Sequence, residues 1–292
     1  MKRFIPFVTF LWMLSALATL TPAQEKTQKI TLEDIYKKGE FTQKSVRGLR
    51  SMDDGIHYTV LEKNSRIVKY SYKTGKEIET LFDASEYSQI SGFERYEFSE
   101  KEDKILIATR VHPIYRRSFT AEFYVYNRED QDLKPLSANG PQRLATFSPQ
   151  GNKVGFVRNN DLFIKDLKQG TEKQITHDGK YNHIINGTTD WVYEEEFAIT
   201  QGFHWSPDGD KIAFYKFDES RVKVFHMTMY QDQLYPEDYT FKYPKAGEKN
   251  SIVKIFVYDL EAGTTKEMDT GEETDQYIPR IKWTPNNNRL CM

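Results

Sequence analysis

The stretch HWSPDGDKIAFYK at residues 204–216 decides the fold. Ser-Pro-Asp-Gly is a turn sequence, because proline fixes φ, aspartate caps the turn locally and glycine adopts the positive φ of a tight hairpin. The residues that follow alternate in the way a half-buried strand requires. The stretch therefore predicts two antiparallel strands joined by a short turn.

The same pattern recurs along the chain. Related segments lie at residues 49–56, 97–105, 146–158 and 282–291. The Ser or Thr positions of the five turns are 51, 99, 148, 206 and 284, which are 48, 49, 58 and 78 residues apart. A second strand-turn-strand segment follows three of these turns, at residues 67–82, 162–176 and 255–269. Two hairpins per repeat make a four-stranded antiparallel blade, and blades arranged radially make a β-propeller.

We therefore predict an all-β fold, an incomplete β-propeller of about four to five four-stranded blades over residues 46–292. The aromatic share of 14% also favours β structure, and a β-sandwich is the alternative. The sequence stops at residue 292, inside an expected strand. Because a propeller closes its ring to avoid an exposed edge, we expect a truncated product or a fragment of a longer protein.

Composition is that of an ordinary soluble globular protein, with 38% hydrophobic and 29% charged residues. The formal net charge of the 292 residues is -2. Without a basic excess, nucleic acid is not an expected partner. No motif in the sequence predicts a cofactor.

The N-terminus resembles an export signal. Lys2 and Arg3 precede an apolar run over residues 4–20, and small residues lead to a cleavage site after Ala23. We predict a signal peptide at residues 1–23, with an uncleaved membrane anchor as the alternative. The single cysteine, Cys291, allows no intrachain disulfide, which fits a bacterial periplasm, a bacterial cell surface or bacterial secretion.

The sequence TTDWVYEEEF at residues 188–197 crowds three carboxylates together. Successive residues of a strand point to opposite faces, whereas on a short helix capped by Thr189 or Asp190 the side chains of Glu195 and Glu196 share a face. Two adjacent carboxylates need a cation, and an ammonium group suits them. The alternatives are a solvated charge run, acids stabilised by the helix dipole, and a metal site, which is the weakest because no His or Cys stands at ligand spacing.

The motifs DWVYEEE at 190–196, WSPDG at 205–209 and YPKAG at 243–247 resemble the dipeptidyl peptidase IV family of the prolyl oligopeptidase clan. The resemblance covers nearly the whole mature chain and implies an eight-bladed propeller. It implies that Glu195 and Glu196 hold the α-ammonium of a peptide substrate, and Glu194 is expected to support the helix or a neighbouring strand. In YRRSFTA at 115–121 it implies that Arg116, rather than Arg117, contacts the substrate backbone carbonyl.

Such a site would measure a peptide from its free end, because an acidic pair fixes the N-terminus and an arginine orients the next carbonyl. The family's catalytic serine lies in a G-x-S-x-G elbow, and that motif does not occur in this sequence. We therefore predict no catalytic residue in this chain, an α/β-hydrolase domain absent from it, and no activity of the chain alone. By the same resemblance, residues 24–45 pack near the hydrolase domain.

The 78-residue spacing between the fourth and fifth turns predicts an arm over about residues 229–251. The resemblance implies that this arm helps to build a homodimer, with four aromatic side chains in the buried contact. These are Tyr235, Tyr239, Phe241 and Tyr243. The alternative is that they pack on their own blade.

Two functions remain open. The favoured one is the substrate-recognition propeller of a dipeptidyl peptidase IV-like serine exopeptidase that removes N-terminal Xaa-Pro or Xaa-Ala dipeptides, with peptides that carry a free N-terminus as partners. The other is a non-catalytic secreted propeller that binds peptides or a partner protein. A downstream G-x-S-x-G motif would decide between them.

Overall fold

The structure, a computed structural model, describes residues 29–286 and 289–292. The predicted signal peptide at residues 1–23 lies outside them. The chain divides into two compact units, residues 1–45 and 46–292. Across these described ranges, no helix is long and apolar enough to cross a membrane.

The described part of the first unit contains one short helix, α2 (Leu32–Tyr36). Thr31 caps it: its Oγ1 accepts the N–H of Asp34 at 3.2 Å, and Asp34 Oδ2 accepts the N–H of Thr31 at 2.9 Å. This reciprocal pair satisfies two N–H groups that a helix start leaves free. Lys38 adds an ion pair to Asp34 at 2.7 Å.

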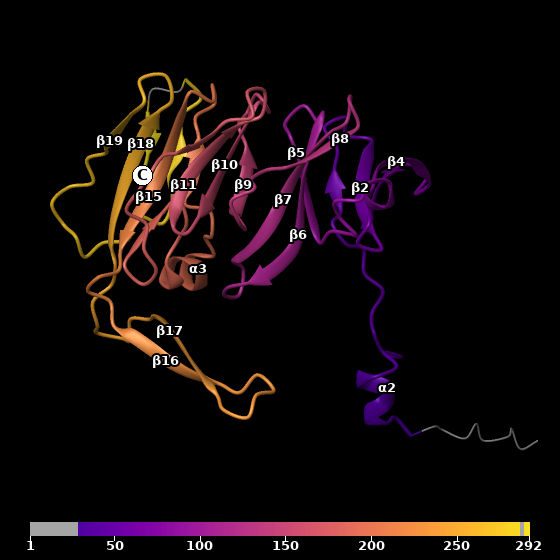
Figure 1. Ribbon diagram of the computed structural model, residues 1–292, viewed down its shortest axis with the longest axis horizontal. Coiled ribbons are helices and arrows are strands. Elements are labelled where there is room, and N and C mark those ends of the chain that lie inside the picture. Colours follow the sequence, from indigo (N-terminus) through magenta and orange to yellow (C-terminus); the bar gives the residue numbers. More distant parts are fainter. Residues whose placement is uncertain (1–28, 287–288) are drawn as a thin grey trace, which may run out of the picture. The chain divides into compact units, whose positions relative to one another are not determined.

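The second unit begins with two four-stranded antiparallel sheets whose strands follow chain order (Figure 1). The first blade consists of β1 (Arg50–Ser51), β2 (His57–Glu62), β3 (Arg66–Ser71) and β4 (Glu77–Asp83), followed by a short 3-10 helix at Ala84–Glu86. The second blade consists of β5 (Arg95–Phe98), β6 (Lys104–Pro113), β7 (Phe119–Asn127) and β8 (Asp132–Pro135).

Two more blades follow. The third consists of β9 (Arg143–Phe147), β10 (Lys153–Arg158), β11 (Asp161–Asp166) and β12 (Glu172–Gln174). The fourth consists of β14 (Phe203–Trp205), β15 (Lys211–Asp218), β18 (Ile252–Asp259) and β19 (Thr264–Glu267), with β13 (Ile184–Asn186) added along β15. A pair of short strands, β20 (Lys282–Trp283) and β21 (Leu290–Cys291), comes last. The described residues thus confirm the predicted four-stranded blades.

Each of the first four predicted turns joins the first two strands of its blade. In three of them the glycine has a positive φ, 69° at Gly55, 67° at Gly151 and 70° at Gly209, which explains why glycine stands there. A buried serine closes the turns of the second, third and fourth blades by accepting the N–H of a lysine five residues later. The distances are 3.0 Å for Ser99–Lys104, 3.2 Å for Ser148–Lys153 and 2.9 Å for Ser206–Lys211.

The hydrophobic core lies between successive blades. In β6, Ile105 and Ile107 pack with the first blade, whereas Leu106 and Ala108 pack with the third. Val157 and Leu162 of the third blade pack in turn against the fourth. Because side chains alternate along a strand, each inner strand buries both of its faces, and the blades stack face to face.

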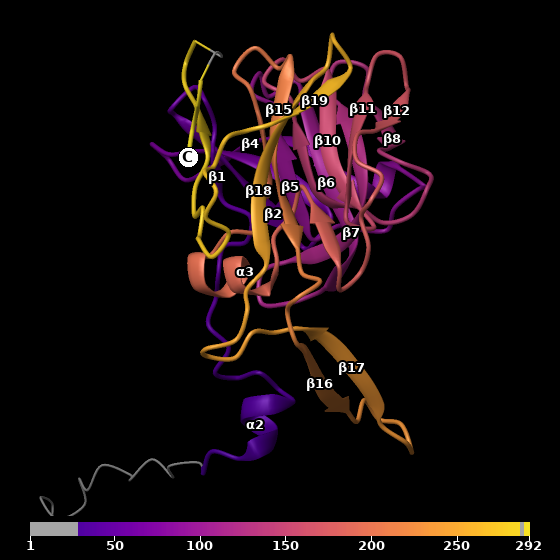
Figure 2. The ribbon, with the colours of Figure 1, turned by 90° about the vertical axis from the view of Figure 1, so that its left-hand side faces the viewer.

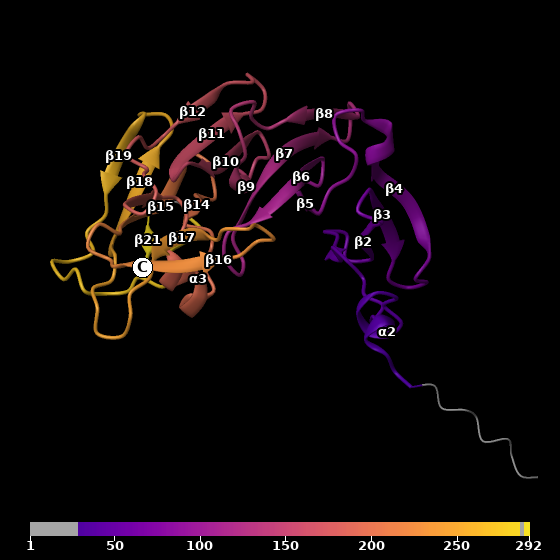
Figure 3. The same ribbon diagram turned by 60° about the horizontal axis from the view of Figure 1, so that its bottom comes forward.

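The fourth blade carries two insertions (Figures 2 and 3). Helix α3 (Trp191–Phe197) precedes β14. A hairpin of β16 (Val224–Met229) and β17 (Glu237–Lys242) separates β15 from β18. The arm was predicted from residue 229, but the paired strands already begin at Val224, because residues 224–229 find their partners in residues 237–242.

Candidate functional site: the acidic helix and its arginine

Helix α3 starts with a buried cap. Asp190 Oδ1 accepts the N–H of Tyr193 at 2.9 Å, and Asp190 Oδ2 accepts the hydroxyl of Ser251 at 2.7 Å. Burial raises the pKa of Asp190, and these hydrogen bonds oppose the shift. Thr189, the other candidate cap, instead donates its hydroxyl to Ile199 O at 2.7 Å.

One side of α3 anchors it to the fourth blade. Tyr193 is 1% exposed, its ring centroid lies 4.8 Å from that of Phe217, and its hydroxyl accepts the N–H of Ile278 at 2.7 Å. The helix ends at Phe197, followed by Ala198 with a left-handed φ of 56°. The acidic residues are therefore carried by a short helix fixed at both ends.

The three acids have different surroundings. Glu194 is fully buried, at 0% exposure, whereas the side chain of Glu195 is 15% exposed and Glu196 is exposed. Each step of a helix turns the side chain by about 100°, so consecutive residues meet different neighbours. The predicted separation of Glu195 and Glu196 from the buried face of the helix is seen, and Glu194 belongs to that buried face.

Arg116 reaches the acidic helix from the second blade. It lies in the β6–β7 connection, its side chain is 72% exposed, and its Nε is 2.9 Å from Oε2 of Glu195. Arg117 is used differently: its backbone N–H donates to Glu194 Oε1 at 2.7 Å and its Nη1 donates to Glu194 O at 3.0 Å. In the structure, Arg116 therefore pairs with Glu195, and Arg117 forms hydrogen bonds with Glu194.

Glu196 lines a cavity beside the helix that neither Glu195 nor Arg116 lines. This cavity of about 470 Å³ lies between α3 and residues 243–250, and Trp191, Phe197 and Tyr243 contribute aromatic walls. The rings of Trp191 and Tyr243 are 4.4 Å apart between centroids. Two acids, one arginine and an open aromatic hollow are therefore gathered at this helix, an arrangement that can accept a cationic group.

Sequence comparison assigns the chain to a family. Residues 99–292 match the family described as the dipeptidyl peptidase IV (DPP IV) N-terminal region. The chain belongs to this dipeptidyl peptidase IV family.

Relatives and solved structures agree with the assignment to the dipeptidyl peptidase IV family. Pig dipeptidyl peptidase 4 is 32% identical over 207 residues, which cover 68% of this chain and 26% of the relative. Human prolyl endopeptidase FAP is 28% identical over 283 residues, covering 92% and 36%. The crystal structure of Porphyromonas gingivalis dipeptidyl peptidase 4 is 44% identical with a TM-score of 0.84, covering 90% of this chain and 38% of that chain. The predicted β-propeller is thereby confirmed, and the chain spans about a third of the length of these relatives.

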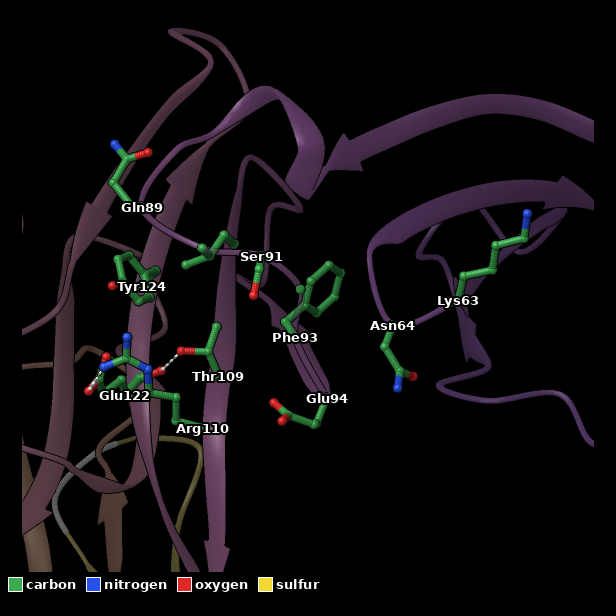
Figure 4. A pocket seen from close by; sticks show the side chains of 12 residues that line it. Lys63, Asn64, Gln89, Ser91, Phe93, Glu94, Thr109, Arg110, Glu122 and Tyr124 are labelled. Carbon is green, nitrogen blue, oxygen red and sulfur yellow. Dashed lines mark hydrogen bonds and ion pairs between the residues drawn. The ribbon is translucent and has the colours of Figure 1, made fainter. Parts of the chain in front are cut away.

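A second cavity lies at the seam between the first two blades of this dipeptidyl peptidase IV family member (Figure 4). It measures about 340 Å³ and holds Lys63, Glu94, Arg110 and Glu122. Arg110 Nη1 is 2.8 Å from Glu122 Oε1. A ligand would have to compete with this ion pair, and none of the predicted site residues lies there.

Sequence reasoning missed two titratable residues near the dipeptidyl peptidase IV family motif, the half-buried Arg143 and the buried Glu219. Arg143 starts β9; burial lowers its pKa, and the carboxylate of Glu194 opposes the shift. Glu219 follows β15; burial and, after it, the charge of Asp190 raise its pKa to about 8, which Lys242 opposes. Neither has a local sequence signal, since a lone Arg or Glu beside a strand is usually solvated.

Proposed function

We propose that this chain is the substrate-recognition propeller of a dipeptidyl peptidase IV-like serine exopeptidase that releases N-terminal Xaa-Pro or Xaa-Ala dipeptides. The observation that carries the proposal is the placement of Glu195 and Glu196 on one short helix with Arg116 against Glu195. In this proposal the α-ammonium group of the peptide binds between the two carboxylates.

The chemistry of the three side chains fits this role. Two neighbouring carboxylates repel each other, and an ammonium group with three N–H donors relieves the repulsion through charge-assisted hydrogen bonds. Arg116 already neutralises part of the charge through its Nε. Its guanidinium has further N–H donors, which would orient the first backbone carbonyl of the peptide. A blocked or missing N-terminal amine would leave the acids without their partner.

Hydrolysis is proposed to depend on parts of the protein outside this chain. The chain has no G-x-S-x-G motif, and it covers 38% of the Porphyromonas gingivalis structure. The chain alone is then inactive, and reproducible hydrolysis of Gly-Pro-anilide by it would overturn this part.

Export through residues 1–23 and a homodimer built with the hairpin β16–β17 belong to the same proposal. The hairpin supports the dimer by exposing large side chains at its tip, with Leu234 at 90% and Tyr235 at 78%. Phe241 is only 7% exposed and lies 5.8 Å from Tyr115 between ring centroids. It therefore packs within the molecule, and the dimer contact is assigned to the tip.

The test compares kcat/KM for free and N-acetylated Xaa-Pro substrates in the full-length protein. Glu195→Gln and Glu196→Gln should each cost about 2–4 kcal/mol of transition-state binding for the free substrate, because each removes one charge-assisted hydrogen bond. Acetylation should inactivate the wild type and cost little more in the double variant. Equal sensitivity to acetylation in both would contradict the proposal.

Glu172→Gln is the matched control. Glu172 also pairs with an arginine, Arg158, at 2.7 Å, and its side chain is 14% exposed, close to the 15% of Glu195. It belongs to β12 of the third blade, so its loss should leave the response to acetylation unchanged. Peptide binding without hydrolysis by the full-length protein would favour the non-catalytic propeller instead.

A further inference from the structure

We propose that Glu194 is a positioning residue that holds the turn at residues 115–118 and thereby places Arg116 against Glu195. Its Oε1 accepts the backbone N–H of Arg117 at 2.7 Å and that of Ser118 at 2.8 Å. These are the two residues that directly follow Arg116. The contact joins parts of the chain that are 76 and 77 residues apart.

Burial makes this contact strong. Glu194 is 0% exposed, and a buried carboxylate is stable only with hydrogen bonds and a compensating charge. The two N–H groups supply charge-assisted hydrogen bonds, and Arg143 of β9 supplies an attractive positive charge. In the described residues, Oε2 of Glu194 and Nε of Arg143 have no hydrogen-bond partner. The hydrogen bonds that this carboxylate accepts therefore come from the turn, and Oε1 accepts them.

The turn has its own internal order but needs an external support. Ile114 donates its N–H to Ser118 O at 2.8 Å, which closes the loop, and Tyr115 donates its N–H to Ser118 Oγ at 3.3 Å. Neither bond connects the turn to helix α3. The connections to α3 are the two N–H bonds to the Glu194 carboxylate, the Arg117 bond to Glu194 O, and the ion pair of the exposed Arg116.

The neighbouring residues Glu194 and Glu195 therefore hold different parts of the same turn. The carboxylate of Glu194 fixes the backbone after Arg116, and one residue later Glu195 receives the side chain of Arg116. An exposed arginine loses much side-chain entropy when it is held in one place, so a fixed backbone reduces the cost of presenting it. The consequence for substrate binding rests on the proposed function, whereas the hold on the turn does not.

The first measurement is hydrogen exchange of the segment at residues 114–119 in the full-length protein. Glu194→Ala should speed exchange of the Arg117 and Ser118 amides by more than 10-fold, and Glu194→Gln by less, because Gln keeps one acceptor oxygen without the charge. Asp161→Asn is the control: Asp161 is 7% exposed and accepts the N–H of Gly179 at 2.9 Å, within the third blade and its following loop. Unchanged exchange in both Glu194 variants would overturn the proposal.

The second measurement is a double-mutant cycle of kcat/KM between Glu194→Gln and Arg116→Ala. Glu194→Gln should lower kcat/KM by roughly 10- to 100-fold in wild type, since a small misplacement of a binding group has such effects, and by less than about 3-fold when Arg116 is already Ala. A merely structural role would give the same loss in both backgrounds and would overturn the positioning role. If Arg116→Ala alone left kcat/KM unchanged, the proposed function of Arg116 would fail, and hydrogen exchange would decide on Glu194.

Discussion

The third and fourth blades have the same order of four strands but differ in the segments that precede or connect these strands. Both open with an S-P-x-G turn and run four antiparallel strands in chain order. The third blade is uninterrupted, and two asparagines with positive φ, Asn159 and Asn160, join β10 to β11. In the fourth blade, the corresponding connection from β15 to β18 holds the hairpin β16–β17, and α3 precedes β14.

The two blades share their strands and differ in the segments added to this repeated scaffold. The strands of the two blades pack alike, with Phe156 of β10 and Phe214 of β15 at matching positions after their turns. The acidic helix and the hairpin occupy the insertions, and the arginine comes from a connection in the second blade. Repeated strands therefore provide stability, and the connecting segments carry the site.

The largest expected effect tests the shared part of the comparison. Phe156 is 0% exposed and Phe214 is 2% exposed, and each stacks on a phenylalanine of the next strand, at 5.5 Å for Phe163 and 5.6 Å for Phe256. Phe156→Ala and Phe214→Ala should each lower the free energy of unfolding by about 3–5 kcal/mol, because each leaves a cavity. Urea unfolding measures both, with Ile56→Ala as control because Ile56 is 62% exposed and lies outside the proposed dimer contact. Losses that differ by more than about 2 kcal/mol would show that the blades are not energetically equivalent.

The stability of the protein should depend on pH through a buried residue of the fourth blade. Burial raises the pKa of Glu219 from 4.5 to about 8, so folding favours the protonated form. The free energy of unfolding should then fall as pH rises from about 4.5 to 8, by up to about 4 kcal/mol. Glu219→Gln should remove much of this fall, whereas Glu237→Gln, at an exposed position of the hairpin β16–β17, should not. Thermal unfolding at pH 5 and pH 8 measures it.

Several titratable and charged groups near Glu219 also affect its pKa. Asp190 and Asp218 act to raise its pKa, Lys242 acts to lower it, and Tyr115 and Tyr181 also face it. Burial raises the pKa of Asp190 in the same direction, so part of the pH dependence should persist in Glu219→Gln. An identical fall of stability in wild type and Glu219→Gln would show that Glu219 is not its source.

The smallest expected effect concerns the two arginine–glutamate pairs. In the third blade, the side chains of Arg158 and Glu172 are 11% and 14% exposed, whereas Arg116 opposite Glu195 is 72% exposed. Glu172→Gln leaves the largely covered guanidinium of Arg158 under-compensated and should cost about 1–2 kcal/mol of stability. Glu195→Gln should cost less than about 0.5 kcal/mol, because water solvates Arg116. Equal losses of stability for Glu172→Gln and Glu195→Gln in urea unfolding would contradict the distinction between a structural pair in the third blade and a functional pair at the acidic helix.

Local sequence was sufficient for the blades because their signals act over a few residues. Proline and glycine set the turn of residues 206–209, and alternation sets the strands on either side. The helical spacing of the DWVYEEE motif likewise separated Glu195 and Glu196 from the buried face. Choosing Arg116 over Arg117 required the resemblance to a family, since nothing in the two adjacent arginines distinguishes them.

The repeat of the blades and the short acidic helix followed from the sequence, whereas the joint role of Glu195 and Glu196 stays a prediction. Three features depended on the tertiary structure: Glu194 is buried against the turn at residues 115–118, Glu219 is a buried titratable residue, and Arg143 is half-buried beside Glu194. The start of the hairpin at Val224 was also decided there. Turns and strand alternation could be predicted because they depend on neighbouring residues in the chain. Burial of a titratable group depends instead on partners that folding brings together from other blades.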